Sequence, residues 1–129
     1  MSPDDRKYTK EHEWLRVEDA SSGLAQMGIT AYAQDQLGDV VYFDLPKVGD
    51  AVTALEKMGE VESVKAVSDL FSPITGEVIQ INDELIDTPE LVNEDPFERG
   101  WLIRVTMDDP SQLDSLMSAA DYDAYVGEL

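Results

Sequence analysis

Residues 51–82 read AVTALEKMGEVESVKAVSDLFSPITGEVIQIN, and this stretch decides the fold. Its apolar positions alternate with polar ones and its connections are tight, which is typical of short, half-buried strands. Pro73-Ile74-Thr75-Gly76 predicts a turn, and residues 78–82 alternate as one more strand. If the runs on either side of Lys65 pair as a hairpin, this lysine lies near the tip and points into water.

Lys65 is the residue that this hairpin would present. Gly49 and Gly76 flank it and allow the turns that close each half of a small sandwich. An exposed ammonium at a fixed hairpin tip suits an enzyme that acylates lysine, and acylation removes the charge while leaving a long flexible stem. An ordinary solvated lysine in a surface turn fits the same spacing, so spacing alone leaves both interpretations open.

Upstream of this stretch, the pattern predicts short strands followed by one helix. Residues 7–29 separate their apolar positions by polar ones, with a turn at residues 19–23. Thr30 can cap a short helix over residues 31–37, and Gly38 occupies the usual stop position. The period therefore changes from strand to helix at Thr30.

Downstream elements are sparser. Residues 40–45 and 101–105 are β-branched and aromatic runs that predict two further strands. Residues 83–100 carry prolines and acids, and we expect a long surface connection there. Pro110 is typical of a helix start, which predicts a C-terminal helix over about residues 110–126.

These elements predict a mainly β fold. Closely spaced strands with frequent glycine and proline indicate a small all-β sandwich or flattened barrel, decorated by a helix near residues 30–37 and a C-terminal helix. The 129 residues have the size of one ordinary domain, and no interior linker is visible. We therefore expect residues 1–129 to form a single domain.

Composition excludes several classes of function. The chain has 9 basic and 28 acidic residues, a net charge of −19, and would repel nucleic acids and anionic membranes. It contains no cysteine, so any redox chemistry must come from a cofactor. It has no apolar run near the roughly 20 residues that span a bilayer, and its acidic start is unlike a targeting signal. We expect a cytoplasmic protein.

Catalytic and metal-binding motifs are absent from the sequence. There is no glycine-rich nucleotide fingerprint and no Walker loop. His12 is the only histidine, which excludes a multi-histidine metal site, and no nucleophile elbow accompanies it. We therefore expect no metal and no catalytic residue, and a structural or surface role for His12.

Four groups of residues, in the same order, resemble glycine cleavage H proteins. ESVKAVSD at residues 62–69, followed by SPITGEV at 72–78, resembles the lipoylation segment of that family. The other groups, which together with this one are spread between residues 8 and 105, are YTKEHEWL at 8–15, GIT at 28–30 with AQ at 33–34 and LGDVV at 37–41, and LVNEDP at 91–96 with GWLI at 100–103.

The resemblance implies a non-catalytic carrier with the lipoyl/biotinyl-like barrel-sandwich hybrid fold. Lipoic acid would be amide-linked to Lys65, on a hairpin near residues 60–70, and attached by a lipoate ligase or octanoyltransferase. The arm would carry an aminomethyl group from a pyridoxal-phosphate glycine decarboxylase (P protein) to a tetrahydrofolate-dependent aminomethyltransferase (T protein). A dihydrolipoyl dehydrogenase (L protein) would then reoxidise the dithiol, and a monomer would present the arm freely.

The resemblance also assigns residues around the arm. Glu13 matches the family position that faces the cationic amine in a sheltering cleft, and Asp69 is a second candidate for that role. Trp14 is assigned to packing. The chain departs from the family at Ala31, where an acid is common, and at Gln36, where some members have a histidine associated with the bound arm.

Four alternatives remain beside this interpretation. A lipoyl domain of a 2-oxo acid dehydrogenase typically has an aspartate before its lysine, whereas Val64 precedes Lys65 here. A biotin carrier typically has methionine on both sides, which Val64 and Ala66 argue against. A relay protein that only passes lipoyl groups to other acceptors would have the same residues around Lys65. A purely structural protein is the fourth alternative.

Overall fold

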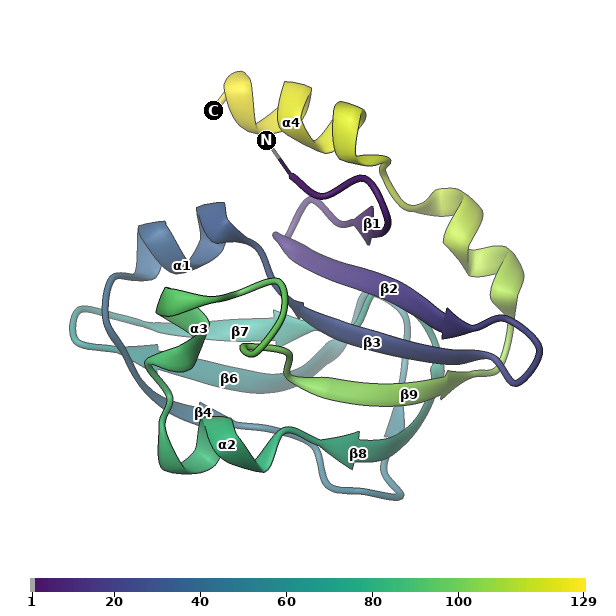
Figure 1. The fold of residues 1–129 in the computed structure, drawn as a ribbon, viewed down its shortest axis with the longest axis horizontal. Coiled ribbons are helices and arrows are strands. Elements are labelled where there is room, and N and C mark those ends of the chain that lie inside the picture. The colour runs from purple at the N-terminus through teal and green to yellow at the C-terminus, as the bar shows by residue number, and fades with distance from the viewer. Residues whose placement is uncertain (1) are drawn as a thin grey trace.

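The computed structural model describes residues 2–129 as two antiparallel sheets (Figure 1). One sheet has six strands in the order β1-β2-β3-β9-β8-β5, and the other has three in the order β4-β6-β7. The strands are β1 Lys7–Tyr8, β2 Glu13–Asp19, β3 Leu24–Ile29, β4 Val40–Asp44, β5 Ala51–Val52, β6 Lys57–Ser63, β7 Val67–Phe71, β8 Gly76–Ile81 and β9 Ile103–Met107. The helices are α1 Ala31–Leu37, α2 Asp83–Asp87, α3 Leu91–Glu94, the 3-10 helix η1 Pro110–Ser115 and α4 Ala119–Gly127.

The main core lies between the two sheets. One buried cluster includes residues from both sheets: Leu15 and Met27 from the larger, and Val61 and Leu70 from the smaller. Alternation supplies these positions, because successive side chains of a strand point to opposite faces. The strand expected over residues 78–82 is β8, but a register shift between Val78 and Gln80 interrupts its alternation.

A second, aromatic cluster fixes the C-terminal helix against the N-terminal strands. Tyr8, Trp14, Ala119 and Tyr122 are buried together where α4 crosses β1 (Figure 1). The Trp14 indole donates hydrogen bonds to the carbonyls of Ile29 and Pro96, both at 3.0 Å. The prediction that Trp14 has a packing role is therefore confirmed.

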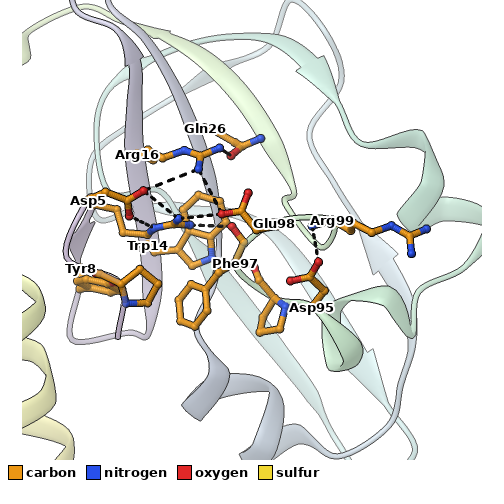
Figure 2. Close-up of polar contacts among 12 residues, drawn as sticks. Asp5, Tyr8, Trp14, Arg16, Gln26, Asp95, Phe97, Glu98 and Arg99 are labelled. Atoms are coloured by element: carbon orange, nitrogen blue, oxygen red, sulfur yellow. Dashed lines mark hydrogen bonds and ion pairs between the residues drawn. The ribbon is translucent and has the colours of Figure 1, made fainter. Parts of the chain in front are cut away.

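Arg6 joins the N-terminal segment to the loop after α3. Its buried guanidinium donates to the Phe97 carbonyl at 2.7 Å and to Asp5 at 2.8 Å, and it lies 4.7 Å from the Trp14 ring centroid. Figure 2 shows Asp5 and Glu98 grouped around this point. The hydrogen bond from Arg6 holds the pKa of Asp5 below its usual value.

Helix α1 forms where the sequence predicts it. The Thr30 hydroxyl accepts a hydrogen bond from the Ala33 amide, and Gly38 ends the helix with a φ of 75°. That φ is positive, where glycine avoids the steric cost that a Cβ would bring. The mainly β fold with a helix over residues 31–37 and a helix near the C-terminus is thus confirmed.

Two expectations about the later chain are wrong in detail. Residues 83–100 are not one irregular connection, because α2 and α3 form there and bury Leu85, Leu91 and Val92 in the core. Asn82 starts α2 by accepting a hydrogen bond from the Glu84 amide.

The C-terminal helix expected over 110–126 is divided into η1 and α4. Met117 and Tyr8 exchange two backbone hydrogen bonds of 2.8 and 2.9 Å, which draws the chain into an extended conformation between the two helices. Ser118 then caps α4 by accepting from the Asp121 amide. A tertiary contact with β1, absent from any local pattern, therefore sets the break. No helix among residues 2–129 is long and apolar enough to span a bilayer.

Candidate functional site

Lys65 lies in the three-residue connection between β6 and β7, and its side chain is exposed. The turn is closed by a hydrogen bond of 2.8 Å from the Ser63 amide to the Ala66 carbonyl. The Ser63 hydroxyl also accepts from the amides of Lys65 at 3.3 Å and Ala66 at 3.1 Å. These contacts fix the backbone of the turn while leaving the lysine side chain free.

A second brace comes from the segment after α1. The Val64 amide donates to the Asp39 carbonyl at 3.0 Å. A Cβ built on Gly38 would lie 3.4 Å from Lys65 Cε, so the lysine stem passes directly over this glycine. The Lys65 ammonium forms no ion pair with any residue in the described part of the chain, which leaves it available for acylation.

Asn93 of α3 holds that bracing segment in place. Its side-chain amide donates to the Gly38 carbonyl at 2.8 Å and to Gln34 at 3.0 Å, and its oxygen accepts from the Val40 amide at 2.9 Å. Sequence reasoning missed this role, because Asn93 falls in the stretch that we expected to be a surface connection. Its place within the LVNEDP motif was the one available signal.

A cleft of about 410 Å³ lies beside the lysine hairpin. One wall is α1, the second is β7, and the third is the segment 11–13 that leads into β2. Gln36 lines this cleft, whereas Ala31 does not. A larger hollow of about 530 Å³ is lined by residues between 44 and 58 and includes none of the residues expected at the site.

Glu13 lines the cleft with a carboxyl group that is almost wholly buried, at 2% exposure. One oxygen accepts from the Thr9 hydroxyl at 2.9 Å, and the other from the Phe71 amide at 3.3 Å. Burial raises the pKa of Glu13 to about 8, because the charged form loses its hydration, while the two hydrogen bonds act in the opposite direction. The group is therefore mostly protonated at neutral pH.

Asp69 lines the cleft from β7, but its carboxylate is already engaged. It lies 3.1 Å from the Lys57 ammonium, which also contacts Glu60 at 2.8 Å. The strand register places Asp69 opposite Glu60, while the next residue, Leu70, points into the core. Alternation therefore puts the Asp69 side chain on the outer face of the small sheet. No sequence pattern indicated that Asp69 would contact Lys57.

His12 forms part of the third wall with an unusual backbone, at a φ of 69°. Its Nδ1 lies 2.8 Å from the Tyr122 hydroxyl, and its ring packs against Tyr32 and Tyr125. Burial lowers the pKa of His12, because the imidazolium form loses hydration. The structure thus brings His12 and Glu13 into one cleft, with Lys65 on the hairpin that borders it.

A β sandwich that presents a free lysine on a braced hairpin, beside a cleft with a buried carboxyl group, has the architecture of a swinging-arm carrier protein. Residues 6–129 match the family model described as Glycine cleavage H-protein. The chain belongs to this family.

Individual relatives agree over nearly the whole chain. It is 54% identical to the glycine cleavage system H protein of Anaeromyxobacter sp. strain K over 98% of its length and 96% of the relative. It is 55% identical to that of Vibrio campbellii over 90% of both chains. The crystal structure of the Mycobacterium marinum H protein superposes with a TM-score of 0.89 at 38% identity, covering 98% of this chain and 99% of the other.

Family membership settles the class of function. The protein is a non-catalytic lipoyl carrier of the glycine cleavage system, and its family carries lipoic acid on a lysine. The fold is the barrel-sandwich hybrid typical of the family. These findings favour the H-protein interpretation over a dehydrogenase lipoyl domain, a biotin carrier or a purely structural protein. Lys65 is exposed beside a cleft and makes no ion pair within residues 2–129, which fits the attachment of such an arm.

Proposed function

We propose that Lys65 Nζ is the atom to which the lipoyl group is attached. The observation that carries this proposal is the rigid turn: hydrogen bonds to the Ser63 hydroxyl and to the Asp39 carbonyl hold the backbone, while the ammonium is exposed and unpaired among the described residues. A ligase can therefore approach the amine without first breaking an ion pair. When bound, the lipoyl group supplies the dithiol that accepts, carries and releases the aminomethyl cargo.

Mass analysis after lipoylation tests this assignment. We expect the peptide that contains Lys65 to gain one lipoyl mass, and Lys65→Arg to abolish both the modification and support of glycine cleavage. Lys47→Arg is the matched control, because Lys47 is also exposed but lies outside the hairpin. Modification of K65R, or unchanged glycine cleavage by K65R, would contradict the proposal.

We also propose that Glu13 shelters the cationic amine of the loaded arm in the cleft. A cation that leaves water needs a carboxylate or several acceptors to offset its lost hydration. Glu13 is buried in the cleft wall, and the Thr9 and Phe71 hydrogen bonds hold its two oxygens in place. The arriving cation would lower the pKa of Glu13 and favour its ionised form. The carboxylate would therefore be negatively charged when the loaded arm occupies the cleft.

The substitution Glu13→Gln tests this role. We expect loaded E13Q to release ammonia into water about tenfold faster than the unsubstituted protein, since it lacks a charge-assisted hydrogen bond. The measurement is ammonia release without the transferase present. Glu77→Gln controls for the lost negative charge, because Glu77 is an exposed residue of β8. Equal rates for E13Q and E77Q would overturn the proposal.

Asp69 is proposed as a secondary member of the cleft. Its carboxylate is shared with Lys57, so it would have to leave that ammonium before it could contact the cargo. We therefore expect Asp69→Asn to accelerate ammonia release by less than E13Q does. Glu60→Gln is the matched control, because it removes the other contact of Lys57 without changing the cleft wall. If E60Q and D69N behave alike, Asp69 has no separate role.

The proposed partners are the P, T and L proteins, together with the lipoate ligase or octanoyltransferase that loads Lys65. Membership of the glycine cleavage family supports the first three. Exchange of bicarbonate with the glycine carboxyl group, catalysed by the decarboxylase, tests the proposal against a pure lipoyl relay, which would not support this exchange. Light scattering tests the expected monomer. The cytoplasmic location stays a prediction.

A further inference from the structure

Tyr122, a buried residue of the C-terminal helix α4, contacts His12 in the third wall of the cleft and Thr30 at the start of α1. The Tyr122 hydroxyl lies 2.8 Å from His12 Nδ1 and 2.7 Å from the Thr30 hydroxyl. Tyr122 is 1% exposed and stacks on Tyr8 with ring centroids 4.8 Å apart. No residue of α4 lines the cleft, so any effect of Tyr122 on the arm has to act through His12 and Thr30.

His12 lines the cleft, whereas Thr30 lies just outside the lining and caps the helix that forms the first wall. Thr30 is the cap of α1, where its hydroxyl accepts from the Ala33 amide, and α1 is the first wall. The Thr30 amide donates to the His12 carbonyl at 3.0 Å, which ties the first wall to the third. The Tyr122 hydroxyl joins the same two residues a second time, through the side chains of His12 and Thr30. The Tyr122 hydroxyl therefore adds a side-chain link to the backbone hydrogen bond that already joins the two walls.

The His12 ring depends on Tyr122 for its orientation. With a φ of 69°, His12 has a backbone that few side-chain-bearing residues adopt, so its direction is set by tertiary contacts. Nδ1 is engaged by Tyr122, and no other hydrogen bond to the ring occurs within residues 2–129. No buried side-chain nitrogen is unpaired in that range, so Nε2 reaches solvent. The bond at one ring nitrogen fixes where the other lies.

We propose that Tyr122 is a positioning residue for the arm cleft: it holds the His12 ring and the capped start of α1 in the arrangement that shelters the cargo. This inference rests on the proposed sheltering role of the cleft. It gives the C-terminal helix a function in the carrier cycle, although the helix contributes nothing to the lining. The remaining groups around the His12 ring are Glu11, Tyr32 and Tyr125, none of which hydrogen-bonds to it.

The test compares Tyr122→Phe with Tyr125→Phe in the full lipoylated chain. Tyr125 lies on the same helix and packs on the His12 ring, but its hydroxyl makes no hydrogen bond with residues 2–129, so Y125F controls for loss of a hydroxyl group alone. We expect Y122F to speed ammonia release from the loaded protein about three- to tenfold, because both contacts of the Tyr122 hydroxyl are lost, and Y125F to leave it unchanged.

The chemical shifts of the His12 ring nitrogens, measured by NMR, provide a second test, because a general loss of stability would not change them in the folded protein. We expect the Nδ1 resonance of folded Y122F to shift relative to the unsubstituted protein and to Y125F. In the unsubstituted protein, loading the arm should shift the His12 ring resonances, because this ring forms part of the wall. This last measurement needs no variant, so the proposal can be tested even if Y122F does not fold.

The outcomes separate the two proposals. If E13Q speeds ammonia release but Y122F and Y125F do not, the cleft shelters the cargo and Tyr122 does not position it. If E13Q also has no effect, the sheltering role fails, and the positioning role fails with it. His12 resonances that stay unchanged on loading would overturn the positioning role in either case.

Discussion

At the scale of single residues, burial of the Glu13 carboxyl group affects stability in a way that depends on pH. Its folded-state pKa of about 8 lies above the value of 4.5 for a solvated glutamate. Between these values the folded chain holds a proton that the unfolded chain has released, so the free energy of unfolding falls as pH rises from about 4.5 to about 8. The buried Glu13 carboxyl group therefore destabilises the folded protein above about pH 4.5.

We predict that Glu13→Gln stabilises the unloaded protein while impairing the loaded one. At pH 8 the free energy of unfolding should rise by about 2 to 4 kcal/mol, and at pH 4 the two proteins should differ little. The amide can donate to Thr9 and accept from the Phe71 amide, so both contacts survive. Urea unfolding at several pH values measures the difference, and a difference independent of pH would contradict the raised pKa.

At the scale of elements, the lysine hairpin depends on a neighbour distant in sequence. Asn93 holds the segment after α1, and that segment accepts the hydrogen bond from Val64. The rigidity of the turn around Lys65 is thus shared between its own Ser63 and the end of α1. Lengthening or distorting either element should change how the lysine is presented without touching the lysine itself.

Alanine substitutions at two glycines can distinguish a change in how Lys65 is presented from the general effect of backbone strain. Gly38 and Gly49 both have positive φ, 75° and 96°, so alanine at either should lower the free energy of unfolding, by about 1 to 3 kcal/mol. A Cβ at position 38 meets the Lys65 stem, whereas one at 49 meets nothing within 4 Å. We predict that Gly38→Ala slows lipoylation of Lys65 and Gly49→Ala does not. Equal lipoylation rates would show that the end of α1 does not control the lysine.

At the scale of the whole molecule, the charge of −19 opposes compaction at neutral pH. We predict that raising sodium chloride from about 0.01 to about 0.5 M increases the Tm at pH 7 by several degrees, because salt screens the repulsion between acids. The increase should shrink near pH 4.1, the sequence pI, where the net charge vanishes. Calorimetry at both pH values checks this, and an equal increase at both would point to another cause.

Much of the fold could be predicted from short-range sequence patterns. Strand alternation and the Thr30 and Gly38 caps fix elements through contacts within a few residues, so the pattern predicted them correctly. The helices within residues 83–100 escaped detection because they are short, and their apolar side chains are buried by partners far along the chain. The division of the C-terminal helix was not predicted either, because it is caused by pairing of Met117 with the distant residue Tyr8.

The sequence by itself determined the mainly β architecture, the acidic surface and the family resemblance that singles out Lys65, because these depend on residue identity and local order. Only the tertiary structure decided the state of the site. Burial sets the pKa of Glu13, Lys57 engages Asp69, and Tyr122 reaches His12 from the far end of the chain. Desolvation and contacts between distant residues exist only once the chain has folded.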